Sequence, residues 1–142
     1  MIIVDTNALS ALMRIEREPA VARWLDGERA EHLRVSAPSL FEVHYGISSL
    51  PAGRKRRELA ARLADVLADV FRNSVLPLDL ASSAEAGRIH ALQVARGRNV
   101  EVPDSQIAGI ARTMGASVAT RNIDDFTGLG IGIINPWDGT GL

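Results

Sequence analysis

The sequence contains no cysteine, few aromatic residues and almost no lysine. Of its 142 residues, 4% are aromatic, and Lys55 is the only lysine among 16 basic side chains. The absence of cysteine excludes a disulfide framework and thiolate chemistry. The scarcity of aromatic rings argues against a base-stacking platform of the kind that binds single-stranded nucleic acids.

Long hydrophobic runs and targeting segments are also missing. No apolar run approaches the roughly 20 residues that cross a bilayer. Asp5 interrupts the N-terminal apolar stretch, which therefore does not resemble a signal peptide. We expect a cytoplasmic protein with no membrane partner. The net charge of −1 neither supports nor excludes a nucleic-acid partner, because local patches of charge decide such binding.

The sequence does contain enough apolar material for one folded domain. Hydrophobic residues make up 46% of the chain, and the absence of repeats and long linkers predicts a single domain over residues 1–142. Strand-like and helix-like patterns alternate, which predicts an α/β fold: a three-layer α/β/α sandwich with a central, mostly parallel sheet. The expected strands are about 2–5, 33–37, 75–78, 117–120 and 131–134, and the expected helices about 6–14, 19–27, 38–50, 54–71, 79–97 and 103–114.

Three acidic residues occupy matching places relative to the predicted strands. Asp5 ends the first strand, and Glu42 lies about one turn into the helix after the second. Asp104 opens the helix before the strand at 117–120. In a parallel sheet these places meet at the carboxyl edge, so we expect three converging carboxylates. Their repulsion is usually relieved by a hard divalent cation, which predicts a site for Mg²⁺ or Mn²⁺.

Each acidic segment also has a purely structural explanation. The segment of Asp5, Thr6 and Asn7 could simply cap the helix after the first strand. Ser39 and Glu42 form a capping-box pattern, with Glu42 at the third helical position. Asp104, directly after a proline, suits the first turn of a helix because its charge favours the helix dipole. Taken singly, Glu42 and Asp104 are better explained by capping, so the functional hypothesis rests on the three acids together.

Six short segments share an order and spacing that is typical of one protein family. They are residues 3–7, 36–46, 102–108, 119–122, 125–126 and 135–137. Each is a weak signal alone, but together they resemble the PIN-domain proteins, and among these the VapC-type toxin ribonucleases of type II toxin–antitoxin systems. Asp5, Glu42 and Asp104 stand where that family has its metal-binding acids.

The resemblance implies a metal-dependent endoribonuclease that hydrolyses RNA phosphodiesters as the toxin of a toxin–antitoxin pair. Asp5, Glu42 and Asp104 would be the catalytic acids and would hold Mg²⁺ or Mn²⁺, directly or through water. Arg121, beside the expected site, would contact an RNA phosphate. Three neighbouring polar residues are expected to orient carboxylates or water molecules: Thr6, Asn7 and Thr120.

The resemblance also implies two protein partners. A cognate antitoxin would cover the acidic pocket with its C-terminal segment and place an arginine in it. A second copy of the chain would form a homodimer by four-helix packing of the segment between residues 38 and 71. The apolar residues that such packing would bury are Phe41, Tyr45, Leu59 and Leu63. The alternative is that these side chains cover the chain's own sheet.

One site position departs from the family pattern. The residue just after the strand at 117–120 is often an aspartate in the family, and here it is Asn122. Asn122 still offers a neutral oxygen, and Asp125 resembles the aspartate before the family's phenylalanine, so both are candidate metal ligands. The substitution weakens the expectation of a second metal ion more than that of the first. Whether Asn122, Asp124 or Asp125 completes the site is left open by the sequence.

Two other functions are compatible with parts of the pattern. The Asn122 substitution keeps open a catalytically weak PIN module that acts by binding RNA or a partner. A phosphoacceptor domain using Asp5 is a poorer match, because Asn7 stands where a phosphatase motif needs its second aspartate. The only lysine, Lys55, also lies in a predicted helix rather than after a strand. The basic run at residues 54–57 is more simply a solvated helix start than an RNA contact.

Overall fold

One six-stranded sheet organises the computed structural model, which describes residues 1–138 and 140–141. The strands are β1 (Ile2–Val4), β2 (Leu33–Ser36), β3 (Val75–Leu76), β4 (Ser117–Ala119), β5 (Ile133–Asn135) and β6 (Thr140–Gly141). Their order in the sheet is β3-β2-β1-β4-β5-β6. The first five are parallel, and β6 runs antiparallel to β5, so the sheet is mostly parallel as predicted.

Helices connect the strands in alternation. Those that the structure describes are α1 (Thr6–Leu12), α2 (Pro19–Gly27), α3 (Ala37–Ser48), α4 (Arg54–Asp69), α5 (Leu80–Ala95) and α6 (Val102–Met114), with short 3-10 turns at Ala30–His32 and Ile123–Asp125. In the described part of the chain, no helix is long and apolar enough to cross a membrane. The predicted helices are confirmed, with differences of a few residues at their ends.

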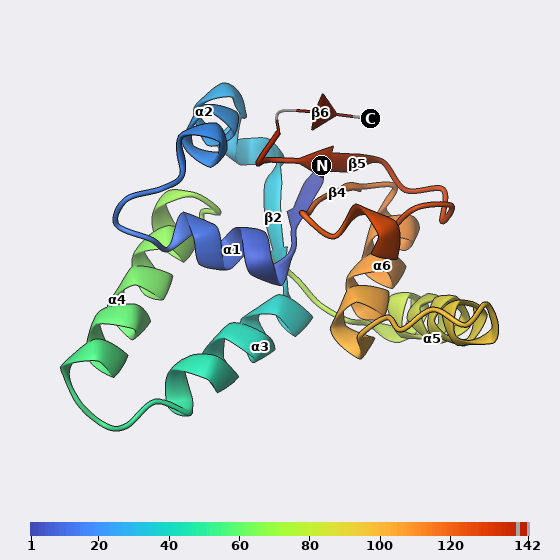
Figure 1. Ribbon diagram of the computed structural model, residues 1–142, viewed down its shortest axis with the longest axis horizontal. Coiled ribbons are helices and arrows are strands. Elements are labelled where there is room, and N and C mark those ends of the chain that lie inside the picture. Colours follow the sequence, from blue (N-terminus) through green and yellow to red (C-terminus); the bar gives the residue numbers. More distant parts are fainter. Residues whose placement is uncertain (139, 142) are drawn as a thin grey trace.

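The sheet is covered by helices on both faces, which confirms the three-layer sandwich. Neighbouring residues of the central strand show this directly, because Ile3 belongs to one buried apolar cluster and Val4 to the other. The cluster around Val4 includes side chains from α1, α2, α3 and α4, and the cluster around Ile3 includes side chains from α5 and α6. In Figure 1, α1 and α4 lie on one side of β2, and α5 and α6 lie together on the other.

The register of the parallel strands brings three strand ends to one level. Val4 is paired with Val35 on one side and with Ala119 on the other. The next residues along the chain, Asp5 and Thr120, therefore leave the sheet side by side at its carboxyl edge. This is the edge at which the acidic residues were expected to meet.

Two sequence expectations about the outer parts of the fold need correction. The last parallel strand begins at Ile133 rather than at residue 131, and the antiparallel β6 was not predicted. Leu63 is 2% exposed, so it belongs to the chain's own core rather than to a dimer interface, and Leu59 is partly buried against the same apolar cluster. Both lie on the face of α4 that packs toward the sheet. The helical spacing of apolar residues predicts an apolar face but does not say whether that face meets the sheet or a second copy of the chain.

Candidate active site

Asp5 lies at the centre of the carboxyl edge and is 1% exposed. Its Oδ1 accepts a hydrogen bond from the amide of Ala8 at 2.9 Å, so Asp5 is itself the N-cap of α1. Its Oδ2 accepts one from the hydroxyl of Thr120 at 2.6 Å. Of the three residues expected to cap this helix, Asp5 does so, and Thr6 and Asn7 lie inside α1. One carboxylate thus combines a capping role with a place in the candidate site.

Glu42 reaches the same edge from α3 and is held by α1. The hydroxyl of Thr6 donates to its Oε1 at 2.5 Å. The predicted capping box of Ser39 and Glu42 is wrong, because α3 begins at Ala37, earlier than expected. The N-cap is Ser36, whose Oγ accepts from the amide of Ser39 at 3.3 Å. Glu42 is therefore beyond the first turn, and its carboxylate is available to the site.

Two serines that the sequence analysis did not assign to the site support this arrangement. Ser36 and Ser39 are both fully buried, and their hydroxyl oxygens are 3.2 Å apart. The Ser39 hydroxyl is also 3.2 Å from the Thr6 oxygen. A chain of hydroxyl groups thus runs from the end of β2 to the Glu42 carboxylate. The signal that could have indicated it is the pair of small polar residues flanking Ala37 and Pro38 at the strand end.

Asp104 and Asp125 form a second pair of acids. Asp104 lies in the first turn of α6, and Asp125 ends the 3-10 turn after β4. Burial, a hydrogen bond with Asp125 and the charges of Asp125, Asp5 and Glu42 together raise the pKa of Asp104 to about 8. A carboxyl group with this pKa keeps its proton at neutral pH, which relieves the repulsion within the pair.

The pKa of Asp5 is raised as well, chiefly by burial. Hydrogen bonds from Thr120 and Ala8 oppose this increase, and the charges of Glu42 and Asp125 add to it. The carboxylates that influence one another in this way are Asp5, Glu42, Asp104 and Asp125. Four segments far apart in the sequence therefore share one acidic cluster at the carboxyl edge of the sheet.

The chemistry of this acidic cluster suits a hard divalent cation. Mg²⁺ and Mn²⁺ prefer carboxylate oxygens, and a cation would relieve the repulsion that protonation of Asp104 now relieves. Within residues 1–138 and 140–141, however, no three acidic or histidine side chains are arranged so that they could hold a metal ion as they stand. Metal binding would therefore require side chains to reorient, beginning with the hydrogen-bonded pair of Asp104 and Asp125.

The loop after β4 supplies Asp125, rather than Asp124, to the acidic cluster. Asp124 is exposed, and its backbone carbonyl accepts a hydrogen bond from the Arg98 guanidinium. Asp125 is half-buried and raises the pKa of both Asp5 and Asp104. The sequence left these two acids undecided because they are adjacent, and the tight 3-10 turn separates them.

Asn122 and Arg121 lie on the rim of the acidic cluster and are both exposed. The backbone amide of Asn122 donates to the hydroxyl of Thr120 at 2.9 Å, so this loop holds the group that in turn supports Asp5. The guanidinium of Arg121 lies over the indole ring of Trp137, 4.9 Å from its centroid. The side chain expected to contact phosphate is thus stacked on an aromatic ring.

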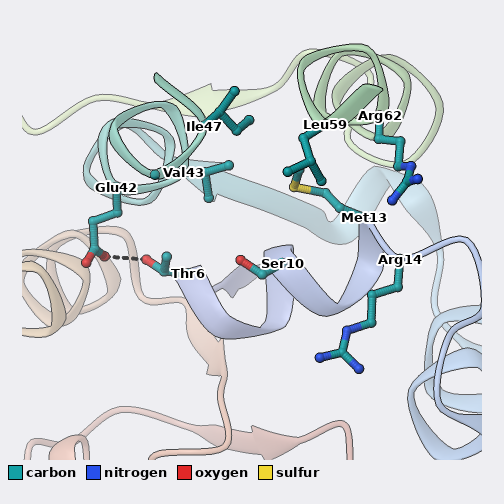
Figure 2. A pocket seen from close by; sticks show the side chains of 10 residues that line it. Thr6, Ser10, Met13, Arg14, Glu42, Val43, Ile47, Leu59 and Arg62 are labelled. Carbon is teal, nitrogen blue, oxygen red and sulfur yellow. Dashed lines mark hydrogen bonds between the residues drawn. The ribbon is translucent and has the colours of Figure 1, made fainter. Parts of the chain in front are cut away.

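An apolar groove adjoins the acidic cluster between α1, α3 and α4 (Figure 2). Its volume is about 260 Å³, and the hydrogen-bonded pair of Thr6 and Glu42 lies at one end. The apolar side chains along it are Met13, Val43, Ile47 and Leu59, and Arg14 and Arg62 add positive charge. The sequence analysis missed this groove, because its lining comes from three helices and no single segment contains its pattern.

Comparison with known proteins identifies the family. A PIN domain family model matches residues 2–130, which is most of the chain. The chain belongs to the PIN domain family. The acidic residues of this PIN domain that were predicted from the family's motifs are those that meet at the carboxyl edge of the sheet.

Relatives of this PIN domain include proteins named as toxins and ribonucleases. VapC ribonuclease Y4jK from Sinorhizobium fredii is 35% identical over 138 residues, which cover 97% of this chain and 99% of the relative. Toxin FitB from Neisseria gonorrhoeae is 30% identical over 137 residues, covering 96% and 99%. The crystal structure of FitAcB from the same organism matches with a TM-score of 0.84 at 30% identity, covering 97% of this chain and 99% of that one. The predicted relationship to VapC-type PIN-domain proteins is confirmed.

Proposed function

We propose that this PIN domain is a metal-dependent endoribonuclease, the toxin of a toxin–antitoxin pair, that hydrolyses RNA phosphodiesters in the cytoplasm. The observation that carries the proposal is the cluster of Asp5, Glu42, Asp104 and Asp125, in which burial and mutual repulsion raise two pKa values. Perturbed carboxyl groups gathered from distant segments are typical of catalytic sites. The names of the relatives, VapC ribonuclease and Toxin FitB, support this class of reaction.

In this proposal the acids are metal ligands. Asp5, Glu42 and Asp104 would hold Mg²⁺ or Mn²⁺, with Asp125 and Asn122 as further candidate ligands. The ion, when bound, supplies a Lewis acid for the phosphodiester oxygens and lowers the pKa of an attacking water. Asp104 must lose its proton before it can act as an anionic ligand, so metal affinity should rise with pH.

The protein's own part is to hold its acids in place before the substrate arrives. Hydroxyl groups of Thr120 and Thr6 fix the carboxylates of Asp5 and Glu42 at 2.6 and 2.5 Å. Such outer hydrogen bonds orient ligands and reduce reorganisation during the reaction. Asn7, exposed on α1 one residue from Thr6, is the third polar residue that we propose orients water at the site.

We propose that the apolar groove between α1, α3 and α4 receives the C-terminal segment of the antitoxin. The groove is lined largely by carbon atoms of Met13, Val43, Ile47 and Leu59, as a surface that binds an amphipathic segment should be. It ends at Glu42, so a segment lying in it would reach the acidic cluster and could place an arginine among the carboxylates. Occupation of the groove would then inhibit the nuclease by covering its site.

A second copy of the chain is the other proposed partner. Phe41 and Tyr45 on α3 are 71% and 68% exposed, and their stacked rings have centroids 6.4 Å apart. Exposed large apolar side chains gathered on one helix favour a protein interface. We therefore propose that a homodimer buries this pair, while Leu63 serves the chain's own core.

The proposed function is tested by RNA cleavage with the purified, antitoxin-free chain. Wild type, Asp104→Asn and the matched control Asp124→Asn would be compared with Mg²⁺, with Mn²⁺ and with a chelator. We expect cutting by wild type and Asp124→Asn that needs the ion, and a strongly reduced rate of cutting by Asp104→Asn. Cutting that survives both the chelator and Asp104→Asn would refute the proposed site.

A second candidate function is a PIN module that binds RNA or a partner with little catalysis. Two observations favour it: the described residues hold no ready arrangement of three metal ligands, and Asn122 stands where a carboxylate is common in the family. This candidate predicts RNA binding by a folded chain that cuts none of a diverse set of RNAs with either ion.

A further inference from the structure

A second cavity lies beside α1 and shares part of its wall with the apolar groove. Its volume is about 220 Å³, and the residues that matter for its chemistry are Asn7, Ser10, Arg14, Glu18, Arg121 and Trp137. Ser10 and Arg14 line both the groove and this cavity. Figure 2 shows the Arg14 side chain, in the bend just after α1, extending away from α3 and α4.

The charged side chains that line this cavity carry a net positive charge. Arg14 and Arg121 come from the C-terminal side of α1 and from the loop after β4, and both are exposed. Among the residues that the structure describes, Glu18 is the only acid in its lining. Pockets that enclose a whole small ligand measure roughly 300–1,000 Å³. A smaller, open and cationic cavity is better suited to one phosphate of a longer chain that continues beyond it.

This cavity is connected to the acidic cluster through Arg121. Arg121 also lines a neighbouring hollow together with Asp124 and Asp125, and Asp125 is a member of the acidic cluster. Thr120, which precedes Arg121, donates its hydroxyl hydrogen to Asp5. An anion between Arg14 and Arg121 would therefore lie next to the carboxylates rather than at a remote surface.

Trp137 determines how Arg121 is presented. The guanidinium lies over the indole ring, 4.9 Å from its centroid, and the ring is partly buried against the core. A stacked guanidinium loses little further freedom on binding, and its N–H groups remain directed outward along its edge. That edge can make a bidentate contact with a phosphate.

We propose that this cavity is a phosphate subsite for single-stranded RNA. Arg14 and Arg121 bind a backbone phosphate next to the scissile one, and Trp137 is a positioning residue that holds Arg121. The choice of RNA as the polyanion rests on the proposed nuclease function. The negative charge of Glu18 in the same lining opposes phosphate binding, so Glu18→Gln should strengthen it.

The test measures binding separately from cleavage. In the Asp104→Asn background, the affinity for a short labelled single-stranded RNA of mixed sequence would be measured by fluorescence anisotropy over a range of salt concentrations. We expect Arg14→Gln and Arg121→Gln each to weaken binding about tenfold. Each should also reduce the slope of log affinity against log salt by about 0.7, the value for one lost phosphate contact to a single strand.

The matched control removes the same charge elsewhere. Arg88 on α5 is exposed and paired with Glu85, which keeps a second partner in Arg112. Arg88→Gln should therefore leave affinity and salt slope unchanged. The subsite would be overturned if Arg88→Gln changed the RNA affinity and the salt slope as much as Arg14→Gln and Arg121→Gln do. It would also be overturned if the Asp104→Asn protein bound no RNA.

Trp137 is tested through its coupling to Arg121. Trp137→Leu should weaken RNA binding about threefold, because it removes the ring that orients the guanidinium. It should have no further effect once Arg121→Gln is present, and Trp137→Phe should retain most of the affinity. The positioning role would be overturned if the losses of RNA affinity in Trp137→Leu and Arg121→Gln added fully in the double variant, because the ring would then act independently of Arg121.

Failure of the subsite and failure of the nuclease proposal give different results. Metal-dependent cutting by wild type, with RNA affinity unaltered in both arginine variants, would refute the subsite alone. Loss of affinity in those variants, with no cutting by wild type, would refute the nuclease and leave the RNA subsite standing.

Discussion

The acidic cluster consists of two pairs of carboxylates that are held in different ways. Asp5 and Glu42 each accept a hydrogen bond from a threonine hydroxyl, Thr120 and Thr6 respectively. Asp104 and Asp125 instead interact with each other, and the pKa of Asp104 rises to about 8. The first pair is oriented by neutral donors, and the second is stabilised by a proton.

This difference indicates which pair of carboxylates would change most when a cation binds. A neutral donor orients a carboxylate without competing with a metal ion for its charge. The proton on Asp104, by contrast, occupies the place that a cation would take and must leave when the ion binds. The first pair therefore provides a rigid half of the site, and the second provides the half that responds to pH and metal.

The largest effect is expected from variants that remove a carboxylate from either pair. Asp5→Asn and Asp104→Asn should each lower the rate of metal-dependent RNA cleavage by about 10²- to 10³-fold, because each removes charge that stabilises the transition state through the ion. Single-turnover cleavage assays with equal amounts of folded protein would measure this. Full activity in either variant would show that this acid is not a ligand.

The second pair of carboxylates should make the stability of the metal-free chain depend on pH. Because the folded-state pKa of Asp104 lies above its ordinary 3.8, its contribution to stability is full below about pH 4 and is lost as the pH rises through about 8. The metal-free chain should therefore melt at a lower temperature at pH 8.5 than at pH 6, and Mg²⁺ should restore several degrees.

Asp104→Asn isolates this effect from other titrating groups. The variant should melt at a higher temperature than wild type at pH 8.5 without metal, and should gain less from Mg²⁺. Thermal melts of both proteins, followed by circular dichroism, provide the measurement. Identical pH dependence in the two proteins would mean that the second pair does not hold a proton at neutral pH.

A smaller effect is expected from the hydroxyl that supports the buried acid of the first pair. Thr120→Val keeps the shape but removes the donor to Asp5, and should weaken metal affinity or activity about 10- to 100-fold. Thr120→Ser retains the hydroxyl and serves as the matched control. Metal titrations of the two variants would show whether the hydroxyl is what matters, and a loss in Thr120→Ser as large as that in Thr120→Val would contradict this role of the hydroxyl.

The smallest effect is expected at Thr6. Glu42 is only half-buried, so water can replace the Thr6 hydroxyl after Thr6→Val. Activity should fall by less than in Thr120→Val, by about threefold to tenfold. A larger loss than in Thr120→Val would contradict the distinction between a buried and a half-buried carboxylate.

Much of the fold and of the acidic cluster was predictable from the sequence, because both follow from local patterns. Strand-like and helix-like spacing predicted the alternating elements, and the parallel topology placed Asp5, Glu42 and Asp104 at one edge. The helix caps were predicted less well. Whether Asp5 or Thr6 becomes the N-cap depends on one residue of strand length, and sequence patterns do not locate element ends that finely.

The remaining features depend on contacts between distant segments. The groove between α1, α3 and α4 has lining residues from three helices, and Arg121 meets Trp137 only because the chain returns past β5. The choice of Asp125 over Asp124 depends on the direction of a single 3-10 turn. No periodic pattern in one segment records such placements.

The most direct test of the account is calorimetric titration of the metal-free chain with Mn²⁺ at pH 7, in buffers of different ionisation enthalpy. The account predicts saturable binding that releases about one proton, because the proton held by Asp104 must leave. It also predicts that Asp104→Asn binds the ion weakly and releases none. Absence of binding, or binding without proton release that Asp104→Asn leaves unchanged, would contradict the claim that this acidic cluster is a metal site.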